Sequence, residues 1–115
     1  MAAWLSGLLR SFRHAFTGIA WALRTQRNLQ IHALAVVVVV MLGLVANIAA
    51  WEWCAVLLCI ALVWMAELFN TALELLCDRV TQQQDEHIRR VKDAAAGAVL
   101  VMAIIAVIVA GIVFL

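Results

Sequence analysis

Residues 66–79 read AELFNTALELLCDR and directly continue an apolar run that begins near Trp53. A helix turns about 100° per residue, so positions i, i+3, i+7 and i+11 fall on one narrow stripe. Here that stripe is polar on an otherwise apolar helix, and its members are Glu67, Asn70, Glu74 and Asp78. At about 1.5 Å per residue, Glu67 lies roughly 21 Å from Trp53, inside or at the edge of a hydrocarbon core about 30 Å thick. Carboxylates at that depth are rare unless they serve an ion, a proton or a substrate, which favours a functional stripe over a solvated face.

The composition is typical of a membrane protein. Of 115 residues, 68% are hydrophobic and 13% are charged, and the sequence has no proline. This is too apolar for a soluble domain of this size and too short for two domains, so we expect a single all-α membrane domain over residues 1–115. The net charge of +1 gives no indication of a nucleic-acid partner.

The basic residues predict the orientation in the bilayer. All eight lie in two clusters, one before the first long apolar run and one between the second and the third. The turn between the first two runs, around residues 47–52, has no Lys or Arg. Because cytoplasmic loops carry the excess of Lys and Arg, the N-terminus is predicted to be inside and the C-terminus outside.

Four helical segments are predicted. Residues 4–24 place Phe and Leu on one face and arginines on the other, which favours a surface helix in the headgroup region. After a polar hinge at 24–32, transmembrane helices are expected at 33–50, at 53–79 with a cytoplasmic extension, and at 94–115. The polar residues 81–90 are interpreted as a cytoplasmic loop. Three short spans have little interior, so we expect a homo-oligomer whose subunit interface covers the carboxylate stripe.

The spacing of the carboxylates limits their chemistry. Glu67 and Glu74 are about two turns apart, roughly 10 Å, which a single Mg²⁺ would not readily bridge. Separate roles are therefore more natural, with the deeper Glu67 as a base and with Glu74 and Asp78 as metal ligands nearer the water. Lys92, close to the membrane boundary, could neutralise phosphate, and a base, a metal and a lysine are what phosphoryl transfer needs. The sequence has no Walker A or kinase glycine-rich loop, so ATP use cannot be argued from such a motif.

The order of these residues resembles a known family. Residues 67–78 fit E-x-x-N-[ST]-A-x-E-x-x-x-D, residues 92–98 fit K-D-x-x-[AS]-[GA]-A, and residues 27–32 read RNLQIH. Together they resemble the prokaryotic diacylglycerol kinase and undecaprenol kinase family over nearly the whole chain. The resemblance implies a small homotrimeric kinase of the bacterial cytoplasmic membrane. Such enzymes move the γ-phosphoryl of Mg-ATP to the hydroxyl of a lipid alcohol at the inner leaflet.

The resemblance also implies roles for the residues of the stripe. Glu67 would be the general base on the lipid hydroxyl, Asn70 would orient that site, and Glu74 would bind magnesium. The remaining motif residues would shape the nucleotide and phosphate end of the site, and these are Asp78, Lys92 and Asp93. Family sites are assembled from neighbouring subunits, which agrees with the expected homo-oligomer.

One position departs from the family pattern. The family usually has a second metal-binding Glu just before the R-N-x-x-I-H stretch, and here that position is Gln26. An amide oxygen can coordinate magnesium but brings no negative charge, so tight binding of a second metal is not expected. The 27–32 and 92–100 stretches look more like the undecaprenol kinase branch, so undecaprenol is favoured slightly over diacylglycerol.

Two alternatives from other classes stay open. One is a small proton- or cation-coupled transporter with Glu67 as its proton carrier, and the other is a non-catalytic membrane assembly subunit that keeps the stripe for packing. Three spans and a stripe at a cytoplasmic helix end favour the kinase over the transporter. The histidines are scattered over separate segments, so no histidine metal site is expected, and His32 is interpreted as a boundary residue.

Overall fold

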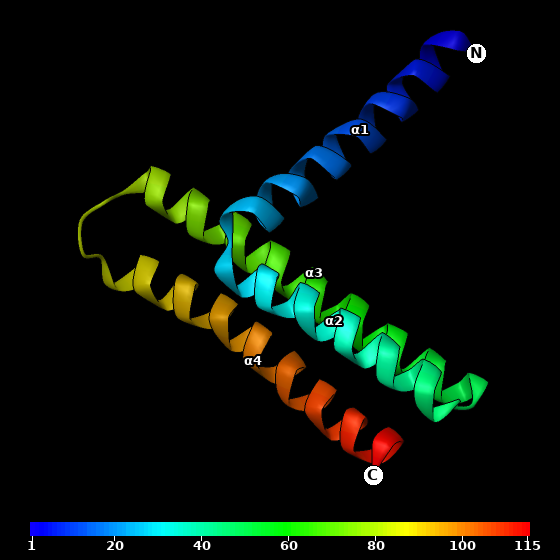
Figure 1. Ribbon diagram of the computed structural model, residues 1–115. Helices are drawn as coiled ribbons and strands as arrows, with labels where there is room; N and C mark the ends of the chain where they lie inside the picture. Colours follow the sequence, from blue (N-terminus) through cyan, green and yellow to red (C-terminus); the bar gives the residue numbers. More distant parts are fainter.

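The computed structural model describes residues 1–115 and contains four α-helices, as Figure 1 shows. They are α1 (Ala2–Thr25), α2 (Arg27–Ala46), α3 (Ala50–Val80) and α4 (Glu86–Phe114). The last three are each long and apolar enough to cross a membrane. The protein is therefore an all-α protein with three candidate membrane spans, and α1 precedes them.

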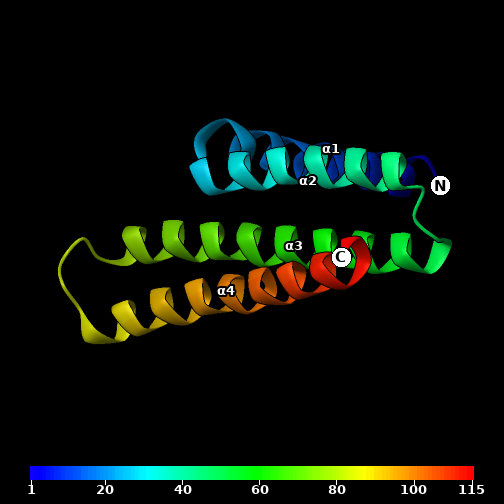
Figure 2. The same ribbon diagram turned by 60° about the horizontal axis from the view of Figure 1, so that its bottom comes forward.

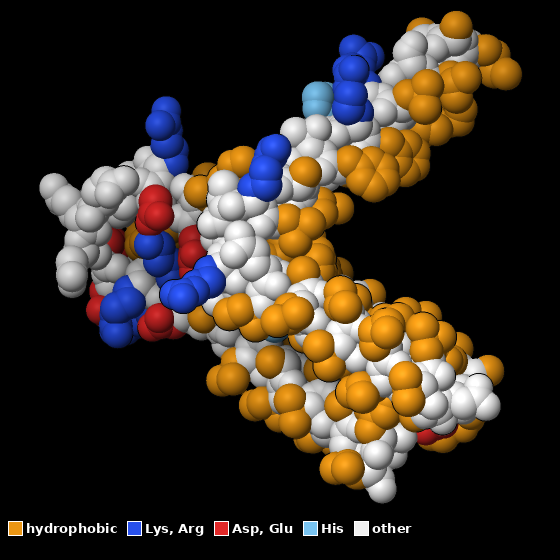
Figure 3. All heavy atoms as spheres, viewed as in Figure 1, with side chains coloured by type: hydrophobic (Ala, Val, Ile, Leu, Met, Phe, Trp, Pro, Cys, Tyr) orange, Lys and Arg blue, Asp and Glu red, His pale blue; other side chains and the backbone are white.

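The helices are arranged around α3, which packs most extensively against α4 and also contacts α2 and α1. Figure 2 shows α1 and α2 in one layer and α3 and α4 in a second. α1 diverges from the end of the bundle where α2 begins (Figure 1). Its apolar and basic side chains lie on different sides of the helix (Figure 3), as expected for a helix at a membrane surface.

The turn between α2 and α3 lies earlier in the sequence than the predicted spans placed it. α2 was expected to run to residue 50, but it ends at Ala46 because Asn47 adopts a left-handed conformation with φ 52°. Such a residue ends a helix, and Asn tolerates this conformation better than most residues. α3 then begins at Ala50, three residues before the predicted start, and the Glu52 carboxylate accepts a hydrogen bond of 2.9 Å from the Ala49 backbone N–H.

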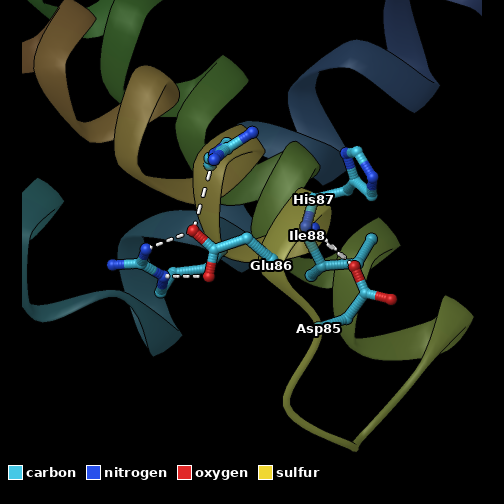
Figure 4. Close-up of polar contacts among 6 residues, drawn as sticks. Asp85, Glu86, His87 and Ile88 are labelled. Carbon is cyan, nitrogen blue, oxygen red and sulfur yellow. Dashed lines mark hydrogen bonds and ion pairs between the residues drawn. The ribbon is translucent and has the colours of Figure 1, made fainter.

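The two polar segments expected between helices are partly helical in the structure. The break between α1 and α2 is confined to the extended residue Gln26, whereas a hinge over 24–32 was predicted. The loop expected at 81–90 ends at Asp85, because Asp85 caps α4. Its Oδ1 accepts hydrogen bonds from the backbone N–H groups of His87 and Ile88 at 2.9 and 3.1 Å (Figure 4). α4 therefore begins eight residues before the predicted span at 94–115.

The chain buries little of its own surface. Only 10 of 115 residues are buried, and large apolar side chains are exposed along α2, α3 and α4. Acidic and basic side chains gather instead at the end of the bundle where α3 connects to α4 (Figure 3). This division is the one expected when apolar helices face lipid or partner helices and one end faces water.

Candidate active site

Glu67 is the most buried polar residue of the chain. It is 2% exposed, and its Oε2 atom is buried without a hydrogen-bond partner. The Nε2 atom of His32 on α2 lies 3.7 Å from this oxygen. A buried polar group without a partner is costly, so such groups in native proteins require an explanation.

Asn70 and Glu74 form a second polar contact, one and two turns further along α3. Asn70 is 7% exposed, and its Nδ2 donates a hydrogen bond of 3.4 Å to Oε1 of Glu74. Its Oδ1 is buried and has no partner. Glu74 is exposed. The amide thus links the buried part of the stripe to its solvent-accessible part and leaves one buried oxygen without a partner.

The C-terminal end of the stripe is joined to α4. Asp78 Oδ1 lies 2.6 Å from the ammonium nitrogen of Lys92, which comes just before the apolar part of α4. This hydrogen bond and the negative charge of Asp78 raise the pKa of Lys92 above its ordinary value of 10.5. The lysine therefore stays charged at neutral pH beside the end of the stripe.

The other two predicted residues make fewer contacts. Gln26 lies at the break between α1 and α2, and its Nε2 donates a hydrogen bond of 3.3 Å to Oγ1 of Thr25. Asp93 is exposed and makes no side-chain hydrogen bond or ion pair. No group of three or more His, Cys, Asp or Glu side chains converges in the chain. The structure thus brings together two pairs of predicted residues, Asn70 with Glu74 and Asp78 with Lys92, rather than one cluster.

Comparison with known proteins assigns the family. The family described as prokaryotic diacylglycerol kinase matches residues 13–114, which is most of the chain. The chain belongs to the prokaryotic diacylglycerol kinase family. Membership makes it a kinase that transfers phosphate to an alcohol group, which decides against the transporter and the non-catalytic subunit.

Two relatives of this kinase carry different substrate names. It is 39% identical over 111 residues to an undecaprenol kinase of Bacillus subtilis, an alignment that covers 96% of the chain and 90% of the relative. It is 42% identical over 105 residues to a diacylglycerol kinase of Synechocystis, with 90% of the chain and 60% of the relative covered. The chain therefore spans less than two thirds of the length of the second relative.

Part of the carboxylate stripe of the kinase is covered within a single chain. The stripe was expected to face a subunit interface, but Glu67 and Asn70 are already buried by the chain's own helices. α2 packs against one side of α3 and α4 against another, so the deeper residues are enclosed. Only Glu74 and Asp78 stay exposed and available to a partner subunit or to a soluble substrate.

The contact between His32 and Glu67 was missed in the sequence, where His32 was treated as a boundary residue. A signal for it exists in the spacing. His32 lies 14 residues before the end of α2 at Ala46, and Glu67 lies 17 residues after the start of α3 at Ala50, since 46 − 32 is 14 and 67 − 50 is 17. In two antiparallel helices joined by a short turn, residues at similar distances from the turn lie at a similar level of the hairpin.

An apolar groove runs beside this contact, between α2, α3 and α4. It is lined by 13 residues, of which 12 are hydrophobic. The exception is His32, which also faces Glu67. A hydrocarbon chain in this groove would therefore have a polar end next to the buried carboxylate.

The oxygen atoms of the stripe are of the kind that magnesium prefers. Mg²⁺ is a hard cation, usually held by one or two carboxylates, by waters and by substrate phosphates rather than by a complete protein cage. Glu74 supplies an exposed carboxylate, and Asn70 supplies a buried amide oxygen without a partner. These donors fit a magnesium ion that is shared with a bound nucleotide.

Proposed function

We propose that this kinase phosphorylates the hydroxyl group of undecaprenol, in preference to diacylglycerol, with ATP as the phosphoryl donor. The observation that carries the proposal is Glu67, a buried carboxylate with an unpartnered oxygen beside an apolar groove. An acidic side chain in apolar sequence is a functional-site candidate by default. The undecaprenol preference is supported by the relative of that name, which aligns over 90% of its length.

Glu67 is proposed to act as the general base. The lipid hydroxyl gives its proton to the carboxylate as its oxygen attacks the γ-phosphorus of ATP, and ADP leaves with the electron pair of the broken P–O bond. The position of Glu67 favours this role, because its carboxylate is buried beside the end of the apolar groove that a lipid could enter. Asn70, one turn away, is proposed to orient the site through its hydrogen bond to Glu74.

The phosphate groups of the nucleotide are proposed to bind at the other end of the stripe. Lys92 is held by Asp78 at 2.6 Å and presents a positive charge near the membrane boundary. Asp93, the next residue on α4, is proposed to shape the same end of the site. This placement lets the nucleotide approach from the cytoplasm while the lipid approaches from the inner leaflet.

Magnesium is proposed to bind at Glu74 and at the amide oxygen of Asn70, with Gln26 as a weaker ligand of a second ion. When bound, it would neutralise phosphate charge and favour in-line transfer. Gln26 would add an oxygen donor without a charge, so a second ion would be held less tightly than by a carboxylate. Its present hydrogen bond to Thr25 uses the amide nitrogen and leaves the amide oxygen available.

We further propose a homotrimer in the bacterial cytoplasmic membrane, with the N-terminus inside and the C-terminus outside. Both basic clusters then face the cytoplasm. The trimer is supported by the extent of exposed apolar surface and by the exposed Glu74, which a neighbouring subunit could face. The surface helix α1, the apolar stretches of α2, α3 and α4 that span the membrane, and the cytoplasmic end of α3 would form one lipid-kinase domain.

The test is a Glu67→Gln variant assayed for both turnover and assembly. The amide has nearly the same shape but cannot accept the proton, so turnover is expected to fall by about 100-fold or more. The oligomer, measured by light scattering in detergent, is expected to be unchanged. If the variant keeps full turnover, the assignment of Glu67 as the base is refuted. If the variant no longer assembles, the stripe has a structural role instead.

A further inference from the structure

Glu67 has one ionisable neighbour on another helix. Its side chain accepts no hydrogen bond, and the nitrogen that approaches its carboxylate is Nε2 of His32 on α2, at 3.7 Å. The oxygen that faces this nitrogen, Oε2, is the buried one. The contact therefore joins α2 to the proposed base across the α2–α3 hairpin.

The separation of 3.7 Å is slightly longer than a hydrogen bond. Catalytic hydrogen bonds are often long without substrate and shorten when the site fills. His32 is therefore in a position to donate a hydrogen bond to Oε2 of Glu67, a buried oxygen that otherwise has no partner.

His32 also faces the groove. It is the one polar residue among the 13 that line the apolar groove between α2, α3 and α4. Glu67 does not line the groove but lies 3.7 Å from His32, so the imidazole lies between the groove and the carboxylate. A polar head group that arrives along the groove would meet His32, with Glu67 directly behind it.

We propose that His32 is a positioning residue of the kinase, whose Nε2–H group holds Oε2 of Glu67 and leaves the other carboxylate oxygen to accept the proton of the lipid hydroxyl. This inference rests on the proposed role of Glu67 as the base. A carboxylate on a flexible side chain can adopt several rotamers, and a hydrogen bond from a neighbouring helix selects one of them. Misplacement of a catalytic group by about 1 Å can lower the rate about 100-fold, so this constraint matters for turnover.

The test compares three substitutions in the full-length chain, purified in mixed micelles with undecaprenol and Mg-ATP. His32→Ala removes the donor, His32→Leu fills the space without a donor, and His32→Gln supplies an amide N–H near the position of Nε2. We expect kcat to fall about 10- to 100-fold in the Ala and Leu variants while KM for ATP is unchanged. The Gln variant is expected to recover kcat to within a few-fold of the wild type.

His87→Ala is the matched control, because His87 is exposed on the first turn of α4 and its side chain makes no hydrogen bond or ion pair (Figure 4). Its kcat is expected to stay within about twofold of the wild type. Thermal unfolding of each variant, followed by circular dichroism, separates turnover from folding. If His32→Ala does not fold, the comparison of the Gln and Leu variants decides, since they have similar volumes and differ in the donor.

A double-mutant cycle with Glu67→Gln separates this inference from the proposed function. If His32 acts through Glu67, adding His32→Ala to Glu67→Gln lowers residual turnover no further. Full turnover in Glu67→Gln would remove the base assignment and this inference with it. An inactive Glu67→Gln together with a fully active His32→Ala, or with His32→Gln and His32→Leu equally impaired, would overturn the positioning role and leave the base in place.

Discussion

The contact between Gly43 and Trp53 leads to a prediction about the α2–α3 hairpin. Gly43 is buried near the end of α2, and a Cβ atom there would lie 2.6 Å from Cη2 and 2.8 Å from Cζ2 of Trp53. Real Cβ atoms essentially never approach so closely, and the indole ring is rigid. Gly43→Ala must therefore move the ring or separate α2 from α3 near the turn.

The expected cost follows from these distances. Overpacking of this kind costs about 1–3 kcal/mol, which exceeds the gain of about 0.5–1 kcal/mol from replacing a helical glycine by alanine. We therefore expect a net loss of about 0.5–2 kcal/mol in the free energy of unfolding, measured by denaturant titration in micelles. Because the same hairpin sets His32 beside Glu67, turnover is expected to fall as well.

Gly111→Ala is the control, because nothing lies within 4 Å of a Cβ built at Gly111 on α4. This variant is expected to be as stable as the wild type or slightly more stable. Trp53→Leu in the Gly43→Ala background makes room for the added methyl group and should recover part of the loss. A Gly43→Ala variant as stable as Gly111→Ala would refute the close packing of α2 on α3.

Three further predictions concern the metal and phosphate end of the site. Gln26→Glu supplies the missing charge and is expected to lower the Mg²⁺ concentration for half-maximal turnover about tenfold. The control variant Gln83→Glu, in the α3–α4 loop, should leave this concentration unchanged. Equal responses of the two variants would contradict a metal at Gln26. Lys92→Met removes the cation proposed to face the nucleotide and should lower kcat/KM for ATP about 100-fold, whereas Arg89→Met should have a small effect. Similar losses in both variants would show that any positive charge in this region serves equally well and that Lys92 has no specific role. The raised pKa of Lys92 means that its contribution to stability is complete below its ordinary value of 10.5 and is lost as pH rises through the higher folded value. Asp78→Asn removes the partner, so the alkaline limb of a stability–pH profile should move to lower pH, and an unmoved limb would show that the pair is not formed in solution.

The sequence predicted the spans and the stripe because both depend on local periodicity. The apolar runs are long enough to be recognised in isolation, and Glu67, Asn70, Glu74 and Asp78 share one face of any helix that contains them. The family assignment also followed from residues close together in the chain. These features need no knowledge of which helix packs against which.

The features that the sequence did not predict depend on single residues or on tertiary packing. Helix ends were misplaced where one residue decides them, as at Asn47 with its left-handed conformation and at Asp85 with its capping carboxylate. The pairing of His32 with Glu67 required the exact position of the turn, which was predicted a few residues too late. The burial of Glu67 within one chain required the packing of α2 on α3, which periodicity does not contain.

The most direct test of the account is phosphate transfer from γ-labelled Mg-ATP to undecaprenol and diacylglycerol, offered together in mixed micelles to the purified chain. We predict that label appears in the extracted lipid, and appears faster in undecaprenol phosphate than in phosphatidic acid. Faster labelling of diacylglycerol would reverse the proposed substrate preference. An absence of label in both lipids, from a folded oligomer at saturating Mg²⁺, would contradict the central claim that this chain is an ATP-dependent lipid kinase.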